Sequence, residues 1–439
     1  MRILHLIQRY WPAIGGAEIH MRELSRRFAA DGHQVTVVTT DALDFELLST
    51  PGGRRVEARD EQIDGVRVLR FPVRHLPFSP LAFRAWRRGL QLLSSLRPLP
   101  VGWISSLSLI APRLPEMWRW FRTTEESFDL VAAMNVGFES LFVAGQRFAR
   151  RRGIPFVSHP IAHLGAGDAP GQDAVGTFHT MRHQVAVVRA SDAVAAQSPA
   201  AREFYVGQGV APERVHVVGP GVNPDAIVGG NAQSFLERHG IRAPLVVYLG
   251  AMAYDKGTFQ VVEAVRRLWR QGIEVELVLA GAVLSAFQDY LDQLPGEDRR
   301  RMRVLGPIDE AEKRDLLAAA DVVAMPSRTD SFGLVYLEAW LYRKPVIGAQ
   351  AWGVSDVIDA GVDGLLVPFG DADALAEALS YLLAHPSVRA EMGARGEAKV
   401  YRLHTWQKKY GAVRSIYAEL VRCGESPPAR VSYDELEQE

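Results

Sequence analysis

The densest group of residues able to do chemistry lies in the segment Pro326–Trp340, PSRTDSFGLVYLEAW. It follows a short apolar run typical of a strand and leads into a helical pattern. The first N–H groups of such a helix have no partner inside it, and with the helix dipole they favour a phosphate. Asp330 and Glu338 flank this turn, and carboxylates accept hydrogen bonds from the paired hydroxyls of a ribose or a sugar. The alternative is a capped helix, with Asp330 or Ser331 as N-cap and a solvated Glu338.

The amide donors of this turn are expected at Ser331, Phe332, Gly333 and Leu334. Glycine at position 333 has no Cβ, so a ligand can approach the backbone closely there. The two carboxylates are separated along the helix, at about 1.5 Å per residue, by roughly the reach of a nucleotide. The segment therefore predicts a diphosphate on the amides, with hydroxyl groups held on either side.

The pattern D-x7-E, with FGLV and LEA inside it, resembles the E-x7-E donor motif of the family 4 glycosyltransferases, which retain anomeric configuration and have the GT-B fold. The resemblance implies that Glu338 holds the donor ribose and that Asp330 contacts the transferred sugar. Asp330 stands where the family usually has glutamate, and its reach is one methylene shorter. The resemblance also implies that four amides contact the diphosphate and the sugar: those of Phe332, Gly333, Leu334 and Val335.

A cation for the diphosphate is expected in Tyr248–Thr258, YLGAMAYDKGT. Lys256 supplies a point charge and Gly257 frees the turn, although an exposed loop lysine is the alternative. The family segment usually carries an arginine followed by Lys-Gly, with both cations on the diphosphate. Ala251 stands at the usual place of that arginine. The lost contact, worth about 1.5–3 kcal/mol, weakens donor binding unless it is replaced, and Arg328 is a candidate substitute.

One histidine of the segment Ile154–Asp168 is expected to contact the sugar. The family carries a histidine at the end of the corresponding strand, where it hydrogen-bonds the transferred sugar. His159 and His163 both fit this position. We prefer His163, because it lies beyond the strand, where the cleft is expected; a plain polar loop residue is the alternative. With Lys256 and Asp330, His163 completes the expected catalytic group.

Two further loops resemble parts of the same family's site. Gly15 and Gly16, in PAIGGAEIH, resemble its GG-x-E loop, which in relatives lines the cleft opposite the donor, and we include them among the donor-binding residues. A glycine pair is otherwise simply a turn. The pattern G-x-G-x-x-G is absent there, which counts against NAD. In relatives, loops such as VLGPID hold the nucleobase, so Gly306, Pro307 and Ile308 are expected in the base pocket.

The region Arg84–Arg122 is basic and aromatic, and Glu116 is its only acid. Basic residues beside interfacial aromatic residues suit an anionic membrane surface or a lipid-linked acceptor. The alternative is an arginine-rich face of ordinary helices. The cations are Arg84, Arg87, Arg88, Arg97, Arg113, Arg119 and Arg122, and the aromatic residues among them include Trp86, Trp103, Trp118, Trp120 and Phe121.

The elements that must position these residues follow from strand-like runs that alternate with helical periodicity, which predicts parallel sheets. Glycines 32 and 272 are placed to end the helices expected at Ala17–Asp31 and Phe259–Gln271. In the first half the expected strands are Ile3–Ile7, Val35–Thr39, Val66–Arg70, Asp129–Met134, Phe156–Ser158 and Ala193–Gln197. In the second half they are Leu245–Leu249, Val275–Ala280, Arg303–Leu305, Val322–Met325, Val346–Ile347 and Leu365–Val367.

The chain of 439 residues is too long for one ordinary core, since domains usually contain roughly 100–200 residues. The Gly- and Pro-rich segment Val217–Asp225 indicates the junction. We expect an N-terminal Rossmann-like, acceptor-binding domain at 1–218 and a C-terminal Rossmann-like, donor-binding domain at 219–403. Residues 404–424 are expected to form a helix that crosses back to the N-terminal domain, and 425–439 a disordered tail. The fold class is α/β, with two Rossmann-like domains that face each other across a cleft.

Composition sets the remaining limits. The hydrophobic share is 48%, the charged share is 23% and the net charge is −1, so no global field draws the chain to nucleic acid, and no such partner is expected. The single cysteine, Cys423, fits a reducing compartment. The N-terminal apolar run is too short for a signal peptide, and Leu99–Pro112 falls short of the about 20 apolar residues of a membrane span. We expect a cytoplasmic protein, peripheral at most at the inner face of the membrane.

Together the residues and the resemblance imply a retaining, metal-independent glycosyltransferase that moves a hexose from a nucleotide-diphosphate sugar to an acceptor hydroxyl. The acceptor is expected to be a carbohydrate, a lipid-linked molecule or a small molecule. No cofactor or metal is expected, because no separate metal-ligand cluster stands out, and Lys256 and the helix-terminus amides stabilise the leaving group. Two alternatives stay open: a sugar-nucleotide epimerase or phosphorylase on the same fold, and a non-catalytic nucleotide-sugar-binding protein, which Ala251 and Asp330 make plausible.

Overall fold

The computed structural model describes residues 1–96 and 99–423, which divide into two compact units. The junction Gly219/Pro220 falls inside the Gly- and Pro-rich segment singled out in the sequence, whereas the expected tail, 425–439, lies outside the described residues. No sequence pattern indicated that a short piece of the first half belongs to the second unit. Of the described residues, unit 1 comprises those within Met1–Ala162, Ala174–Gly219 and Lys409–Cys423, and unit 2 comprises His163–Asp173 and Pro220–Lys408.

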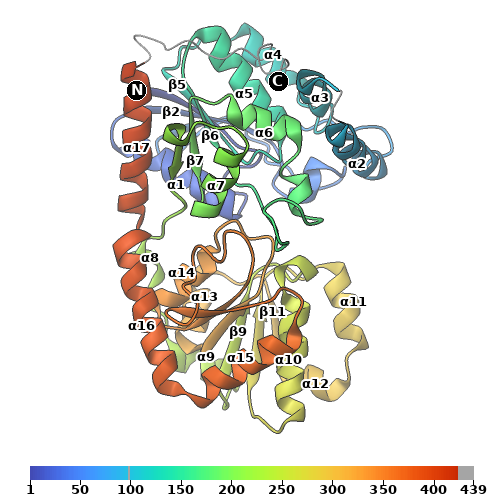
Figure 1. The fold of residues 1–439 in the computed structure, drawn as a ribbon, viewed down its shortest axis with the longest axis vertical. Helices are drawn as coiled ribbons and strands as arrows, with labels where there is room; N and C mark the ends of the chain where they lie inside the picture. Colours follow the sequence, from blue (N-terminus) through green and yellow to red (C-terminus); the bar gives the residue numbers. More distant parts are fainter. Residues whose placement is uncertain (97–98, 424–439) are drawn as a thin grey trace. The chain divides into compact units, whose positions relative to one another are not determined.

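Unit 1 is built on eight strands: β1 (Arg2–Leu6), β2 (Gln34–Thr40), β3 (Asp60–Ile63), β4 (Val66–Phe71), β5 (Leu130–Met134), β6 (Phe156–His159), β7 (Ala193–Ala196) and β8 (Val215–Val217). They form one sheet in the order β3-β4-β2-β1-β5-β6-β7-β8, and only β3 pairs antiparallel. Figure 1 labels β2, β5, β6 and β7 of this sheet. The helices are α1 (Gly16–Ala30), α2 (Leu81–Ser95), α3 (Val101–Ser108), α4 (Pro115–Thr123), α5 (Glu139–Arg152), α6 (Arg182–Arg189), α7 (Pro199–Gly207) and α17 (Trp406–Cys423).

The C-terminal helix α17 joins the core of unit 1 through aromatic packing. Tyr417 is fully buried and stacks on Phe28 of α1, with ring centroids 5.0 Å apart. Tyr410 donates a hydrogen bond of 2.6 Å to Asp31, just beyond the end of α1. These contacts explain why the last described residues belong to the first unit, although they are far from it in sequence.

Unit 2 has six strands, all parallel: β9 (Leu245–Leu249), β10 (Glu276–Ala280), β11 (Met302–Gly306), β12 (Val322–Met325), β13 (Val346–Ala349) and β14 (Gly364–Val367). Each lies within one or two residues of its predicted bounds, and their order is β11-β10-β9-β12-β13-β14. The helices are α8 (Pro224–Ile227), α9 (Ala232–His239), α10 (Thr258–Arg270), α11 (Ser285–Gln293), α12 (Gly296–Arg300), α13 (Glu310–Ala319), α14 (Leu334–Leu341), α15 (Ala372–Ala384) and α16 (Pro386–Leu403).

Both sheets confirm the predicted α/β class with two Rossmann-like units. The central strands of unit 2 are continuous apolar runs, and every residue of β9 and β12 is buried, as expected for a parallel sheet covered on both faces. None of the described helices is long and apolar enough to cross a bilayer.

Each sheet has a point at which the order of its strands reverses. In unit 1 this point lies between β1 and β5, and in unit 2 it lies between β9 and β12. Open α/β sheets bind ligands beyond the carboxyl ends of the strands at such a point. The loops that follow β9 and β12 are therefore the first place to look for a site in unit 2.

Candidate functional site

The loops after β9 and β12 are fastened to each other at the reversal point of the unit 2 sheet. The backbone N–H of Arg328 donates to the carbonyl of Asp255 at 3.0 Å, and its guanidinium donates to the carboxylate of Asp255 at 2.7 and 2.9 Å. Gly257 has φ +81°, and a Cβ there would lie 2.4 Å from the carbonyl oxygen of Pro326. Glycine is required at this close approach, which fixes Lys256 beside the turn that precedes α14.

Lys256 and Asp330 form an ion pair at this point, with 2.8 Å between Nζ and Oδ1. Burial acts to raise the pKa of Asp330, but the charge and the hydrogen bond of Lys256, with smaller contributions from Ser327 and His163, together outweigh burial and hold the pKa below its usual range. The second carboxylate oxygen, Oδ2, is buried and accepts no hydrogen bond of good geometry within residues 1–96 and 99–423. Unpaired buried oxygens are rare, so this atom is available to a ligand hydroxyl.

The turn before α14 leaves a row of backbone donors open. Gly333 caps the helix with φ +88°, a conformation that glycine adopts without strain. Phe332 anchors the turn, because it is buried and packs on His404, with the two ring centroids 5.4 Å apart. Among the described residues no hydrogen-bond acceptor is found for the amides of Ser331, Phe332, Gly333, Leu334 and Val335. The arrangement matches the predicted phosphate site.

Glu338 lies on α14 and is paired with a residue that the sequence did not suggest. Lys313 of α13 donates to Glu338 at 3.0 Å and also pairs with Glu310 at 2.9 Å. Burial raises the pKa of Glu338, and Lys313 partly offsets this rise. Burial acts to lower the pKa of Lys313, yet the two carboxylates outweigh it and raise that pKa. Lys313 therefore favours the ionised form of Glu338, the residue expected to hold the ribose.

The structure separates the two candidate histidines. His159 is the last residue of β6 in unit 1, where it is buried against Tyr417 with 3.0 Å between Nε2 and Oη. His163 belongs to unit 2 and lies close enough to Lys256 and Asp330 for both charges to act on it. Burial, and then Lys256, lowers the pKa of His163 to about 4. His163 is therefore a neutral imidazole at physiological pH and lies near Lys256 and Asp330, and the catalytic role of the three residues stays a prediction.

The loop that carries His163 is held in unit 2 by Trp352. The backbone N–H of Trp352 donates to the carbonyl of Gly165, and its indole N–H donates to the carbonyl of Gly167, both at 2.9 Å. Asp173 closes the loop by accepting the N–H of Ala166 at 3.0 Å. Trp352 was not among the predicted site residues, because nothing in its sequence context links it to a loop so far away in the chain.

Arg328, the candidate substitute for the arginine missing at Ala251, is already engaged. Besides its contacts to Asp255, its guanidinium lies over the ring of Phe369, 4.7 Å from the centroid. It borders a small pocket of about 240 Å³ whose lining residues are Ala166, Gly167, Asp173, Arg328, Gln350, Pro368 and Phe369. Lys256 is therefore the cation that directly accompanies the acidic turn.

The other predicted residues lie in two further loops. Gly306 ends β11 with φ +69° and accepts the N–H of Gly281 at 2.7 Å, and Ile308 packs partly against the unit 2 core. Gly15 and Gly16 start α1 in unit 1. A Cβ at Gly15 would lie 2.3 Å from the carboxylate of Glu18, which would have to move, whereas a Cβ at Gly16 meets nothing within 4 Å.

Two family models match the chain. The first, described as a glycosyl transferase 4-like domain, matches residues 15–221. The second, described as glycosyl transferases group 1, matches residues 233–399. Together they span most of both units.

Similar proteins are known from sequence and from structure. D-inositol 3-phosphate glycosyltransferase 1 of Catenulispora acidiphila is 26% identical over 428 residues, which are 94% of this chain and 93% of that protein. The D-inositol 3-phosphate glycosyltransferase of Xylanimonas cellulosilytica is 33% identical over 296 residues, which are 64% of this chain and 70% of that protein. HepE from Anabaena, solved with UDP and glucose, shares the fold with a TM-score of 0.70 at 21% identity, over 95% of this chain and 99% of HepE. Sucrose-phosphate synthase from Thermosynechococcus elongatus also gives a TM-score of 0.70 at 21% identity, over 96% and 100% of the chains.

Proposed function

Since this chain belongs to the group 1, family 4-like glycosyltransferases with the GT-B fold, we propose that it transfers a hexose from a nucleoside diphosphate sugar to an acceptor hydroxyl with retention of configuration. Unit 2 is proposed to bind the donor, and unit 1 the acceptor. Glycosyltransferase activity is common to the relatives; retention and independence from metal are our proposals for this chain.

One observation in the site carries the proposal. The buried, unpaired Oδ2 of Asp330 lies beside a cation and directly before a row of open amides. An oxygen that accepts a hydroxyl, next to donors that bind a diphosphate, is the combination that a nucleotide sugar requires. An ordinary capped helix would use its own side chain to satisfy these groups.

Different residues of unit 2 are proposed to bind the diphosphate, the ribose and the base of the donor. The ammonium group of Lys256 has three N–H donors, and one of them donates to Asp330, so two remain for the diphosphate. Glu338 accepts the ribose hydroxyls, and the loop with Gly306 and Ile308 borders the base. UDP is the first nucleotide to test, because HepE has been solved with UDP.

The chemistry follows from where charge develops. As the bond between the anomeric carbon and the diphosphate oxygen breaks, negative charge grows on the diphosphate, and Lys256 and the amides of the turn stabilise it without a metal. The acceptor hydroxyl attacks on the face that the diphosphate leaves, and its proton passes to the departing phosphate. Neutral His163 donates a hydrogen bond to the sugar, and Asp330 orients a sugar hydroxyl.

The place of action is proposed to be the cytoplasm, with peripheral contact at the inner face of a membrane. The single cysteine supports a reducing compartment, and the basic and aromatic residues of Arg84–Arg122 support the membrane contact. The acceptor is proposed to be a carbohydrate, a lipid-linked molecule or a small molecule.

Turnover of UDP-glucose over an acceptor panel tests the proposal. We expect an α-linked product by NMR, full activity in EDTA, and a large loss of kcat in Lys256→Ala but none in Lys408→Ala, which removes an exposed lysine. UDP-glucose binding without turnover on any acceptor would favour the non-catalytic alternative. An inverted product or loss of activity in EDTA would contradict the corresponding part of the proposal.

A further inference from the structure

Unit 1 exposes large apolar side chains along one stretch of its surface. Phe78 is 89% exposed at the tip of the loop before α2, and Trp103 is 69% exposed on α3. Solvent-facing aromatic side chains of this size mark an interaction site when they occur in a group. The α2–α3 face, as we name it, has the exposed apolar residues Phe78, Leu81, Leu92, Leu96, Trp103 and Ile110.

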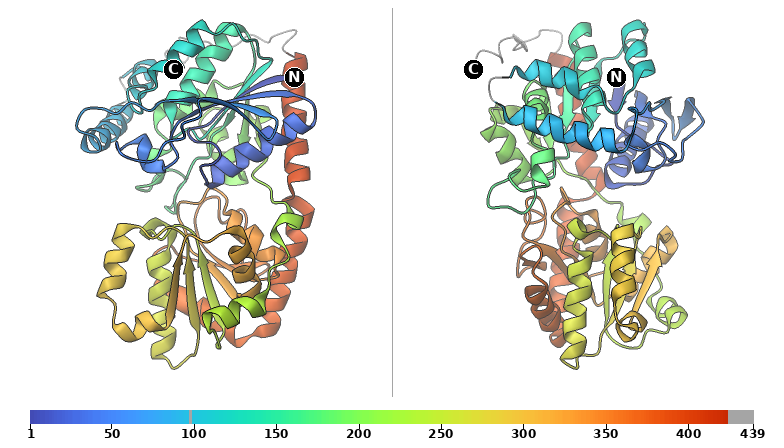
Figure 2. Two further views of the ribbon diagram at one scale, coloured as in Figure 1. Left: turned by 180° about the vertical axis from the view of Figure 1, so that it is seen from behind. Right: turned by 90° about the vertical axis from the view of Figure 1, so that its right-hand side faces the viewer.

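The exposed side of α2 combines apolar and basic residues. Leu81, Arg84, Arg88 and Leu92 recur at intervals of three or four residues, so they lie on one side of the helix, and all four are exposed. Trp103 is exposed on α3, and Ile110 is exposed two residues beyond the end of that helix. The second view in Figure 2 shows α2 and α3 side by side at the surface of unit 1.

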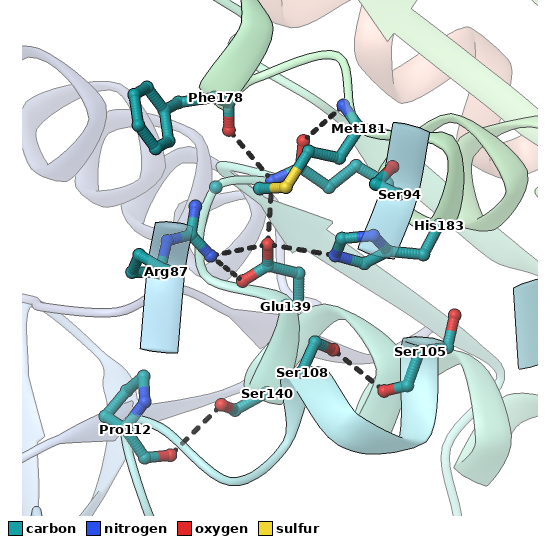
Figure 3. A network of polar contacts seen from close by, with 12 residues as sticks. Arg87, Ser94, Ser105, Ser108, Pro112, Glu139, Ser140, Phe178, Met181 and His183 are labelled. Atoms are coloured by element: carbon teal, nitrogen blue, oxygen red, sulfur yellow. Dashed lines mark hydrogen bonds and ion pairs between the residues drawn. The ribbon is translucent and has the colours of Figure 1, made fainter. Parts of the chain in front are cut away.

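The opposite side of these helices is firmly anchored. Arg87 points inward from α2 to Glu139, the first residue of α5, at 2.7 and 2.9 Å (Figure 3). Leu90 of α2, Ile104 of α3 and Met181 form a buried cluster between the helices. Arg87 is among the cations that the sequence pattern assigns to an anionic membrane. That expectation is wrong for Arg87, because Glu139 already engages it. These inward contacts leave the residues of the α2–α3 face exposed.

Apart from Arg87, the described arginines between Phe78 and Arg122 form no ion pair with an acidic side chain among the described residues. Glu116, the only acid between Phe78 and Arg122, is engaged by Arg74 at 3.0 Å. Within the described chain no ion pair is found for the exposed side chains of Arg84, Arg88, Arg113, Arg119 and Arg122. A group of cations without counterions attracts an anionic surface.

An apolar pocket opens beside the same surface. It has a volume of about 410 Å³ and is lined by Leu76, Leu109, Ile110, Arg113, Leu114, Pro115 and Trp118. Arg113, which lines the pocket, exchanges backbone hydrogen bonds of 3.0 and 3.3 Å with Arg74. Ile110 belongs both to the pocket and to the α2–α3 face. Arg113 is exposed and places a cation at the edge of the apolar lining.

We propose that the α2–α3 face docks on an anionic lipid bilayer and that the pocket takes one acyl chain of an anionic lipid. Trp103, Phe78 and the exposed leucines enter the interface, Arg84 and Arg88 meet the head groups, and Arg113 meets the phosphate of the lipid in the pocket. A large apolar side chain between unpaired cations is the combination that an anionic bilayer binds. The inference rests on the membrane contact proposed above and not on the donor site, so its failure removes that contact and leaves the transferase proposal standing.

Co-sedimentation of the full chain with vesicles tests the docking. We expect binding to phosphatidylglycerol vesicles and little to phosphatidylcholine vesicles. Arg84→Gln with Arg88→Gln should weaken binding about 30-fold, since each arginine near an anionic surface contributes about fivefold. Trp103→Ser should weaken it about tenfold, because an interfacial indole is lost. The matched controls Arg299→Gln with Arg300→Gln and Tyr401→Ser, which alter exposed residues of unit 2, should bind as wild type.

Quenching by phosphatidylglycerol brominated on its acyl chains tests the pocket, because Trp118 lines it. The quenched fraction of tryptophan fluorescence should fall in Trp118→Phe, whereas it should rise slightly in Trp11→Phe, which removes an indole outside the pocket and so lowers only the unquenched emission. Equal binding to both vesicle types, or equal quenching in both variants, would overturn the respective part of the proposal. Self-association of the wild type that Trp103→Ser abolishes would assign the face to a second copy of the chain and would overturn the docking.

Discussion

Replacement of Lys313 by methionine tests how the charge of Lys313 affects Glu338 while the packing around the two residues is largely kept. Methionine keeps most of the apolar stem of lysine but removes the cation that lies 3.0 Å from the carboxylate. Burial already raises the pKa of Glu338, and without Lys313 nothing offsets that rise. The neutral carboxylic acid is a poorer acceptor for ribose hydroxyls, so donor binding should become dependent on pH.

The distance sets the size of the effect. Two charges at this separation attract by about 5 kcal/mol at an effective dielectric constant of about 20, and loss of one partner of a buried pair costs about 3–5 kcal/mol. A buried carboxylate without its cation takes up a proton instead. Because the folded-state pKa is raised, the ionised fraction falls as the pH decreases, by about tenfold for each pH unit below that pKa.

Calorimetric titration with UDP at several pH values measures this effect. Lys313→Met should bind UDP at least about tenfold more weakly than wild type near pH 6, and the gap should narrow as the pH rises towards 9. Lys313→Arg, which keeps the cation, should follow the wild type, as should Lys408→Met at an exposed position. A flat affinity ratio across this range, with melting temperatures unchanged, would refute the role assigned to the pair.

Three further predictions concern the turn, the leaving group and the fold. Gly333→Ala should lower UDP affinity at least about tenfold in calorimetry, because φ is +88° and the added Cβ would lie 2.3 Å from the ring of the tyrosine three residues on; wild-type affinity would contradict this. Lys256→Ala should reduce kcat by about 10²–10³, as loss of one preorganised donor does, and steady-state kinetics would show it. Burial lowers the pKa of His5 to about 3 and of His159 to about 4, and it holds the pKa of His20 well below its usual value. The unfolded chain therefore binds more protons below about pH 6.5, and urea unfolding should show stability falling from pH 7 to pH 5; a constant stability would contradict it.

The sequence predicts the sheet of unit 2 well because its strands are continuous apolar runs that a parallel sheet buries. The strands β3 and β8 of unit 1 were missed for physical reasons. Asp60–Ile63 is polar and half exposed on the sheet edge, and Val215–Val217 is only three residues long and runs into the Gly- and Pro-rich junction. Such segments become strands through pairing with a neighbour, which their own pattern does not reveal.

The site shows the same division between local and long-range information. The acidic turn before α14 is a local pattern, and its residue types alone predict open amides and flanking carboxylates. The pairing of Lys256 with Asp330, 74 residues apart, depends on β9 lying next to β12. The pairing of Lys313 with Glu338 and the hold of Trp352 on the His163 loop likewise depend on tertiary packing, which spacing along the chain does not encode.

Calorimetric titration of UDP-glucose into wild type and Glu338→Ala tests the central claim most directly. If the turn before α14 binds the diphosphate sugar between Asp330 and Glu338, the wild type binds UDP-glucose, and folded Glu338→Ala shows no measurable binding. The control Glu377→Ala, which alters an exposed residue, should bind UDP-glucose as the wild type does. Undiminished affinity in a folded Glu338→Ala protein would contradict the account.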